Sequence, residues 1–220
     1  MSHGRLIDVS HTVEHGAVTY RGLPGPVISD HLSREASRPH YAPGTEFLIG
    51  KIEMVGNTGT YLDSPFHRYP DGKDLAALPL ESLANLDCVV AQVPSGSAPA
   101  IDRLPLAEAD VRGRAVLVQT GWDRHWGTDR YFAGHPHLTG RLAEWLVGAG
   151  VVLVGIDSLN IDGTATNERP VHSTLLRHDV PIVEHLRGLA AVPERGGRFF
   201  AVPAKVKAFT TFPVRAFVLA

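Results

Sequence analysis

Cysteine is nearly absent from this 220-residue chain, which holds a single one, Cys88. No disulfide can therefore form within the chain, and this is typical of proteins kept in a reducing compartment. Cys88 begins the apolar run at residues 88–91, a setting that predicts a buried, inert thiol and not a nucleophile. A chain of this length buries enough surface to fold without a disulfide or a structural metal.

Long apolar runs and blocks of like charge are also missing. The net charge is −2, with both signs scattered along the chain, so no basic patch predicts nucleic-acid or membrane binding. The longest apolar run, around residues 151–156, is far too short to cross a bilayer, and residues 1–7 lack the apolar stretch of a secretory signal. We expect a cytoplasmic protein that acts on a small molecule, without nucleic-acid or membrane partners.

Short, Val-rich runs recur along the chain and predict α/β architecture. Several are apolar throughout, as expected for strands that are covered on both faces. One helix is predicted over residues 139–148, capped by Thr139, with Leu142 and Leu146 in its apolar stripe and glycines at its end. We expect a single compact domain over residues 1–220 with a mixed sheet. The predicted strands cover residues 6–10, 47–53, 89–93, 115–119, 151–156, 180–183, 199–206 and 214–219.

Proline and glycine gather at residues 22–26 and 39–44. Both residue types interrupt regular structure, so residues 21–45 are predicted to form an irregular N-terminal arm. Arms of this kind often cover a site or a neighbouring subunit.

The segment at residues 56–67, with the sequence GNTGTYLDSPFH, brings a carboxylate and an imidazole close together. Its Gly, Asn, Asp, Ser and Pro content predicts turns, and the residues before Pro65 favour extended or turn backbone. Composition alone is typical of a solvated loop. Asp63 and His67 are nevertheless only four residues apart, which makes them candidates for acid–base or metal chemistry.

This segment resembles the signature of the kynurenine formamidase and cyclase group, a metal-dependent hydrolase and cyclase group with the pattern His-x-Gly-Thr-His-x-Asp-x-Pro-x-His. The chain has NTGTYLDSPFH at that place. The resemblance implies a swivelling β/β/α fold, and a homodimer or homotetramer joined by the N-terminal arm. Other segments resemble the group in the same order: residues 6–12, 121–126, 155–157, 170–172, 182–184 and 212–216.

The resemblance also implies roles for individual residues. In the group, the two leading histidines of the signature, its aspartate, a later histidine and a later glutamate hold one or two divalent ions, usually zinc or manganese. The last signature histidine, here His67, shuttles protons. An aromatic residue from the N-terminal segment covers the substrate ring, and Tyr20 falls near that position. The metal-ligand positions correspond here to Asn57, Tyr61, Asp63, His172 and Glu184.

Two of these positions depart from the pattern. Imidazole binds zinc well because its nitrogen lone pair is available at neutral pH. Asn57 offers only a carbonyl oxygen, and Tyr61 would first have to lose a proton from a group with an ordinary pKa of about 10. The ion that depends on the two missing histidines is therefore not expected. Asp63, His172 and Glu184 remain, and we weigh one zinc or manganese ion there against our preferred expectation of no metal.

Without a metal, the remaining groups form an acid–base site. Two converging carboxylates repel, so one of Asp63 and Glu184 should hold a proton at neutral pH. Tyr61 and Asn57 become donors to a substrate oxyanion, His67 remains the proton shuttle, and His172 and Glu184 contact the substrate.

Three hypotheses follow for the function. The preferred one is cyclisation, dehydration or isomerisation of a small cyclic or aromatic carbonyl compound, with a role in secondary metabolism. The alternatives are a mononuclear metal-dependent hydrolase of an amide, lactone or lactam, and a non-catalytic binding protein.

Several other polar residues have ordinary structural explanations. His11 is expected to be a hydrogen-bonded structural histidine. Asp157 and Asp162 flank Asn160, and backbone capping is preferred for both, with substrate contact as the alternative. His135 and His137 have a spacing that occurs in metal sites, but ligation by them is not expected.

Overall fold

One mixed sheet organises the body of the molecule in this computed structural model, which describes residues 4–94 and 96–220. Among these residues, nine strands form the sheet in the order β1-β13-β11-β5-β7-β9-β10-β4-β12. The prediction that residues 1–7 carry no secretory signal falls partly outside the described residues, because residues 1–3 are not described. The strands are β1 (Leu6–Asp8), β4 (Tyr61–Asp63), β5 (Leu86–Gln92), β7 (Ala115–Gln119), β9 (Leu153–Ile156), β10 (Ile182–Glu184), β11 (Arg195–Phe200), β12 (Thr211–Pro213) and β13 (Phe217–Leu219).

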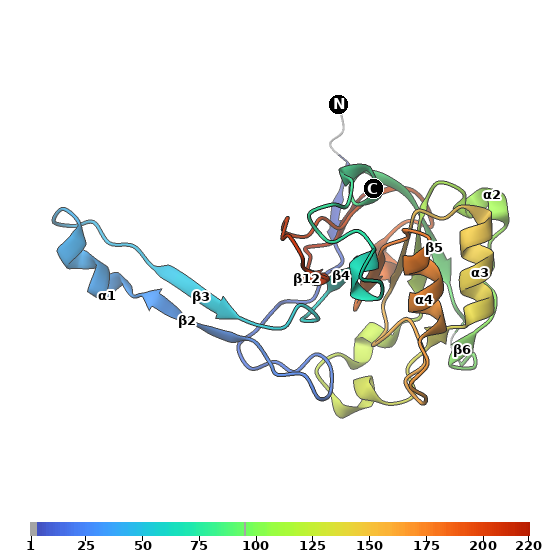
Figure 1. The fold of residues 1–220 in the computed structure, drawn as a ribbon, viewed down its shortest axis with the longest axis horizontal. Helices are drawn as coiled ribbons and strands as arrows, with labels where there is room; N and C mark the ends of the chain where they lie inside the picture. Colours follow the sequence, from blue (N-terminus) through green and yellow to red (C-terminus); the bar gives the residue numbers. More distant parts are fainter. Residues whose placement is uncertain (1–3, 95) are drawn as a thin grey trace.

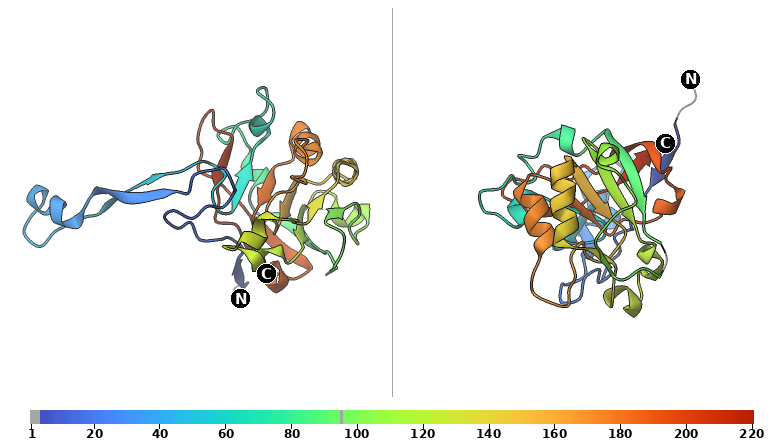
Figure 2. Two further views of the ribbon diagram at one scale, coloured as in Figure 1. Left: turned by 90° about the horizontal axis from the view of Figure 1, so that it is seen from below. Right: turned by 90° about the vertical axis from the view of Figure 1, so that its right-hand side faces the viewer.

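The centre of this sheet is parallel and covered on both faces. Strands β5, β7, β9 and β10 run parallel to one another, whereas β11 pairs antiparallel with β5 and β4 antiparallel with β10. Helices α3 (Gly140–Ala149) and α4 (Pro170–Arg177) lie side by side over one face (Figures 1 and 2). Val116 and Val118 of β7 pack towards these helices, while Leu117 packs into a second core on the opposite face. This alternation confirms strands buried on both sides.

Helix α3 begins and ends close to the predicted residues. The Thr139 side chain accepts a hydrogen bond from the Leu142 N–H at 3.3 Å, and Gly150 ends the helix in a left-handed conformation, with φ of 82°. Gly148, expected near the end, lies inside the last turn. Helix α4 is not predicted from the sequence, although it carries His172.

The remaining elements are short. None of the described helices is long and apolar enough to span a membrane. Cys88 is buried, and burial raises the pKa of its thiol to about 11, which confirms the prediction of an inert thiol. The other elements are α1 (Arg34–Ser37), α2 (Glu108–Val111), β2 (Val27–Leu32), β3 (Ile49–Glu53), β6 (Ala100–Ile101), β8 (His137–Leu138) and the 3₁₀ helices η1 (Arg38–His40), η2 (Pro65–His67), η3 (Leu80–Ser82), η4 (Trp122–His125), η5 (Asp129–Phe132) and η6 (Leu189–Ala191).

Part of the segment at residues 56–67, whose composition alone is typical of a solvated loop, forms a buried strand. Strand β4 lies between β10 and β12, and all three of its residues are buried. Pairing with two other strands overrides the turn-like composition of the flanking residues. Gly56 permits this close fit, because a Cβ there would lie 2.2 Å from the carbonyl oxygen of Thr211. A second correction concerns residues 201–206, which leave the sheet after β11 ends at Phe200.

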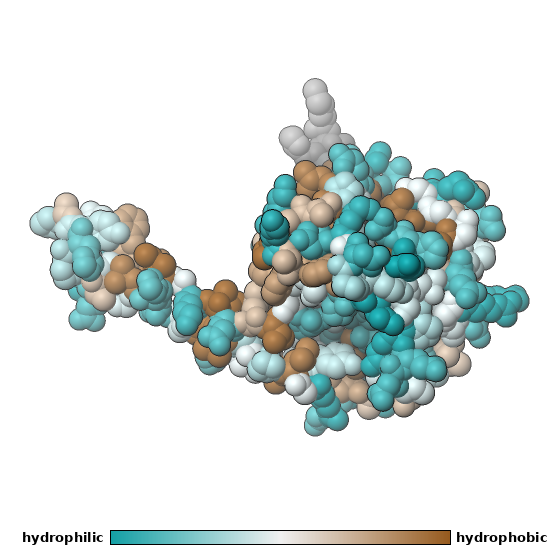
Figure 3. All heavy atoms as spheres, in the orientation of Figure 1, coloured by the Kyte–Doolittle hydropathy of each residue, from teal (hydrophilic) through white to brown (hydrophobic). Residues whose placement is uncertain are grey.

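The N-terminal arm is regular, contrary to the prediction of an irregular one. Strands β2 and β3 form an antiparallel hairpin whose tip carries α1 and η1. Figures 1 and 2 show this hairpin extending away from the body. Ile28 and Ile52 stand opposite each other and are 44% and 49% exposed, and apolar surface follows the arm in Figure 3. An isolated two-stranded hairpin with an exposed apolar face is only marginally stable.

We propose that a second copy of the chain covers this face, as expected for a homodimer or homotetramer. Replacing both Ile28 and Ile52 by Lys should dissociate the oligomer, because each charge would be buried against apolar surface. Size-exclusion chromatography with light scattering should then give a mass near 23.8 kDa. Leu80→Lys, at an exposed position on the body, is the control and should keep the oligomer. A monomeric wild-type chain would contradict the proposal.

Candidate active site

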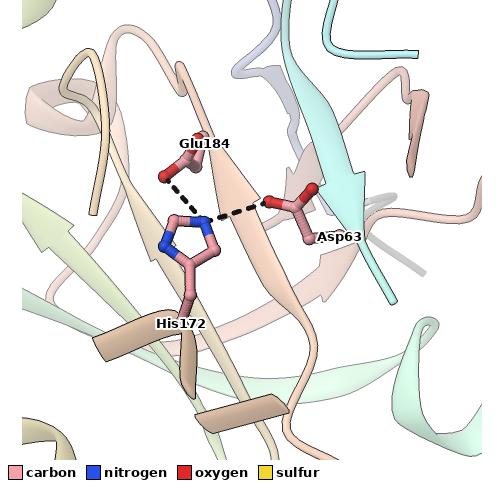
Figure 4. A group of neighbouring side chains, drawn as sticks. All are labelled: Asp63, His172 and Glu184. Carbon is pink, nitrogen blue, oxygen red and sulfur yellow. Dashed lines mark ion pairs between the residues drawn. The ribbon is translucent and has the colours of Figure 1, made fainter. Parts of the chain in front are cut away.

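Asp63, Glu184 and Tyr61 share one face of the sheet. In the β4–β10 pair, Tyr61 stands directly opposite Glu184 and Asp63 opposite Ile182. Residues two apart on a strand point to the same side, so all these side chains face α4. His172, in the first turn of α4, completes the group. Figure 4 shows its ring between the two carboxylates.

The three groups fit one metal ion. His172 Nε2 lies 3.7 Å from Asp63 Oδ2 and 3.6 Å from Glu184 Oε1, and the three candidate ligand atoms are within 4.8 Å of one another. In a tetrahedral zinc site with ordinary bond lengths, ligand atoms are about 3.3 Å apart, so only small shifts are needed. Asp63 Oδ2 is buried and has no hydrogen-bond partner. A cation would satisfy this oxygen, which otherwise carries a large desolvation cost.

Asp162 holds the His172 ring in the orientation that a metal requires. Its carboxylate accepts hydrogen bonds from the backbone N–H groups of Val171 and His172, at 2.8 and 2.9 Å, and from His172 Nδ1 at 2.7 Å. The backbone capping expected for Asp162 is confirmed. The contact with Nδ1, which the sequence did not reveal, points Nε2 towards Asp63 and Glu184, so that its lone pair faces them once Nε2 has lost its proton.

Without a cation, this cluster retains protons. Burial raises the pKa of Glu184 to about 7, which agrees with the prediction that one of the two carboxylates is protonated. Burial opposes protonation of His172, but the hydrogen bond to Asp162 and the nearby carboxylates of Asp63 and Glu184 outweigh it and raise the pKa to about 10. An incoming ion must displace the proton from His172 Nε2, so metal uptake would release protons.

Tyr61 contacts the cluster directly. Its ring is buried, and its hydroxyl donates a hydrogen bond to Glu184 Oε2. Burial, together with the charges of Glu184 and Asp63, raises the pKa of Tyr61 well above its ordinary value, while a hydrogen bond with Asn57 lowers it. The phenol therefore keeps its proton and is not a ready metal ligand.

His67 is held on η2 through a residue that the sequence analysis did not single out. Thr211 Oγ1 lies 2.6 Å from Asp63 Oδ1 and 3.2 Å from His67 Nδ1. An ionised carboxylate only accepts, so the Thr211 proton is donated to Asp63, and Thr211 accepts a hydrogen bond from His67 Nδ1–H. This fixes the neutral tautomer in which His67 Nε2 is unprotonated and able to act as a base.

These groups border one pocket of about 860 Å³. Asp63 lies beside it, in contact with His172. Leu23, Arg68 and Asn160, which were not predicted as site residues, also line the wall. The sequence-predicted residues that line the pocket are Tyr20, Asn57, Tyr61, His67, His172 and Glu184.

The other candidates have structural roles. His11 stacks on Trp126 with ring centroids 3.7 Å apart, and its backbone N–H, not its ring, is hydrogen bonded, to Thr60. Asp157 accepts hydrogen bonds from the backbone N–H groups of Thr120 and Gly121, which confirms backbone capping. His135 Nε2 contacts the carbonyl oxygen of Asp162 at 3.0 Å.

A family model described as "Putative cyclase" matches residues 7–163, which is more than half of the chain. The chain belongs to the cyclase family. This confirms the resemblance drawn from the signature segment. Assignment of the whole span 1–220 to one cyclase domain stays a prediction.

Relatives and solved structures extend the match over nearly the whole length. The kynurenine formamidase of Bordetella petrii is 30% identical over 221 residues, covering 96% of each chain. That of Bacillus cereus (strain ATCC 10987 / NRS 248) is 25% identical over 219 residues, covering 99% of each.

Solved structures share the fold at low identity. An isatin hydrolase bound to thioisatinate has a TM-score of 0.79 at 19% identity, covering 99% of this chain and 93% of the other. A structure described as a novel cyclase has a TM-score of 0.79 at 14% identity, covering 100% and 88%. These likenesses confirm the predicted single mixed α/β domain.

The names of these relatives are those of enzymes, as expected. They describe hydrolases more than lyases or isomerases. The preferred hypothesis of cyclisation, dehydration or isomerisation therefore has less support than the hydrolase alternative.

Burial of His11 predicts acid sensitivity. Burial, assisted by the charge of Arg187, lowers the pKa of His11 from 6.5 to about 3. The unfolded chain therefore gains a proton at His11 below pH 6.5 while the folded chain does not, and stability falls as the pH drops from 6.5 towards 3. In urea unfolding, the free energy of unfolding should fall between pH 7.5 and 5 in the wild type by about 1–2 kcal/mol more than in His11→Phe. Equal losses in both proteins would contradict this.

Proposed function

We propose that the protein is a metal-dependent hydrolase that opens a small cyclic or aromatic amide, lactone or lactam. The observation that carries this proposal is the convergence of Asp63, His172 and Glu184, with a buried Asp63 oxygen that has no hydrogen-bond partner. The relative named kynurenine formamidase, and an isatin hydrolase that shares the fold, support the reaction class. Solved neighbours described as potential or predicted metal-dependent hydrolases are consistent with a metal requirement.

Asp63 Oδ2, His172 Nε2 and Glu184 Oε1 would hold the ion, for which we propose zinc or manganese. When bound, such an ion supplies Lewis acidity, which polarises a carbonyl group and lowers the pKa of water. Three protein ligands leave room for a further ligand on the pocket side, as catalytic zinc sites require.

The protein's own residues would bind the substrate and move the proton. Tyr20 and Leu23 provide an aromatic and an apolar wall for a ring. His67 Nε2 is free to take a proton from the attacking water and to pass it to the leaving nitrogen or oxygen. Arg68, beside His67 on the pocket wall, places positive charge near the carboxylate that ring opening produces.

The metal-free reaction, which was preferred from the sequence, has a physical weakness. It required the Tyr61 hydroxyl to donate to a substrate oxyanion, but that hydroxyl donates to Glu184. A purely binding role has no use for a histidine whose tautomer is fixed as it is at His67. Metal-dependent hydrolysis uses both the hydrogen bond from Tyr61 to Glu184 and the fixed tautomer of His67. A cytoplasmic location stays a prediction.

Metal dependence can be tested with isatin and an aryl formamide as substrates. Zinc- or manganese-loaded protein should hydrolyse the ring amide of isatin or the amide bond of the formamide, because a carboxylate product requires activated water. A chelator should abolish turnover, and the removed ion should restore it. Asp63→Asn should bind no ion and remain inactive. Chelator-treated protein that contains no ion by elemental mass spectrometry but keeps full activity would contradict the proposal.

The role of His67 can be separated from metal binding. His67→Ala should lower kcat by about 10²- to 10⁴-fold, the usual contribution of a positioned acid–base group. Metal content should be unchanged, since His67 is not among the three grouped ligands. His178→Ala, at the exposed end of α4, is the matched control and should keep wild-type kcat. Undiminished kcat in His67→Ala would remove the proposed proton transfer.

A further inference from the structure

The two buried carboxylates of the site share one pattern of contacts. Each has one oxygen that faces His172 and one that accepts a hydrogen bond from a hydroxyl group. In Asp63, Oδ2 faces His172 Nε2 and Oδ1 lies 2.6 Å from Thr211 Oγ1. In Glu184, Oε1 faces His172 Nε2 and Oε2 accepts from the Tyr61 hydroxyl.

The strand pairing fixes both hydroxyl donors. Tyr61 stands opposite Glu184 across β4 and β10, and Thr211 stands opposite Asp63 across β4 and β12. Directly opposed side chains on one face of a sheet are in contact range. Each donor therefore reaches its carboxylate from the neighbouring strand without any loop having to close.

Tyr61 has little freedom to leave Glu184. Its ring is 1% exposed and lies 5.1 Å from the ring of His185, measured between centroids. His185 is fixed in turn by a 2.9 Å hydrogen bond to the Tyr131 hydroxyl. Glu184 Oε1 also accepts a hydrogen bond from the Ile161 N–H at 2.6 Å, which holds the carboxylate from its other side.

We propose that Tyr61 and Thr211 are positioning residues that make Glu184 and Asp63 one-oxygen ligands and restrict the site to a single ion. This inference rests on the proposed function, since it concerns the same metal site. The oxygens that would have to hold a second ion, Asp63 Oδ1 and Glu184 Oε2, are each occupied by a side-chain hydroxyl group. Glu184 Oε1 accepts only the backbone N–H of Ile161 and still faces His172 Nε2. A phenol that donates its proton to a carboxylate cannot serve at the same time as a phenolate ligand.

The consequence for the bound ion is a low coordination number. With both carboxylates limited to one oxygen, the chain supplies three ligand atoms and leaves the fourth position to water or substrate. If the hydroxyl of Tyr61 were removed, Glu184 Oε2 would keep only the longer hydrogen bond from Asn160 Nδ2, at 3.5 Å, and the carboxylate could turn to offer both oxygens. Loss of such an outer hydrogen bond typically weakens metal binding by about 10- to 100-fold.

The test uses full-length protein and three measurements: ions bound per chain by elemental mass spectrometry at excess zinc, the zinc dissociation constant by competition with a chelating dye, and the visible spectrum of the cobalt(II)-substituted protein. The wild type should saturate at one ion and give the intense bands of four-coordinate cobalt. Tyr61→Phe should bind zinc about 10- to 100-fold more weakly, and its cobalt bands should weaken as coordination expands.

Tyr131→Phe is the matched control. It also removes a buried tyrosine hydroxyl, but that hydroxyl contacts His185 and not a ligand, so zinc affinity and the cobalt spectrum should not change. If Tyr61→Phe unfolds, Thr211→Val supplies the same test through Asp63 Oδ1. Circular dichroism of each variant identifies unfolding.

Three results would overturn the inference. Two ions per wild-type chain would contradict the single-ion site, and an unchanged zinc affinity and cobalt spectrum in folded Tyr61→Phe or Thr211→Val would contradict the positioning role. In either case chelator-sensitive hydrolysis by the wild type would leave the proposed function standing. A wild-type chain that binds no ion would instead remove the proposed function together with this inference.

Discussion

The pairing of β4 with β10 is the constraint on which the rest of the site depends. It places Asp63 opposite Ile182, so that Asp63 and Glu184 lie on the same face of the sheet, offset by two residues. Both lie under the first turn of α4. A shift of one residue in this register would turn Asp63 and Glu184 to opposite faces of the sheet. Strand β12, on the other side of β4, supplies Thr211 from the same pairing scheme. Strand pairing thus places Asp63, Glu184 and their hydroxyl donors, while the loop before α4 orients His172 through Asp162 and holds Glu184 through the Ile161 N–H.

Buried charge explains why so many polar groups surround this point. Asp63, His172 and Glu184 are all buried, and two carboxylates together in the interior are costly unless cations and hydrogen bonds compensate. The surrounding donors meet that requirement almost completely, through Thr211, Tyr61 and the Ile161 N–H. The remaining oxygen, Asp63 Oδ2, has no hydrogen-bond partner. Among the described side chains it is the clearest sign that the site is built for an ion.

The sequence predicted the elements whose signals are local. Strand β7 matches its predicted range of residues 115–119, and Thr139 and Gly150 mark helix α3 because capping depends on nearby backbone groups. Elements that depend on distant partners were missed or misjudged. Strand β4 has the composition of a loop, and the arm hairpin has the prolines and glycines of an irregular segment.

The residues of the candidate site also fall into two groups, those that a motif in the sequence marks and those that only the fold brings to the site. Resemblance to the family supplied Asp63, His67, His172 and Glu184, since these residues stand in ordered motifs along the chain. Thr211 and Asp162 act on the site only through contacts that the fold creates, and no motif marks them. Tyr61 was noticed as a departure from the family pattern, but its partner could not be known before the strand register was known. That partner, Glu184, changes the expected role of Tyr61 from a donor to substrate into a donor to a proposed metal ligand.

The most direct test of the account is anomalous X-ray diffraction at the zinc edge from crystals of zinc-loaded protein. The account predicts one strong peak per chain, about 2.0–2.2 Å from Asp63 Oδ2, His172 Nε2 and Glu184 Oε1. A well-ordered site with no peak there, or with the ion bound by other residues, would contradict it.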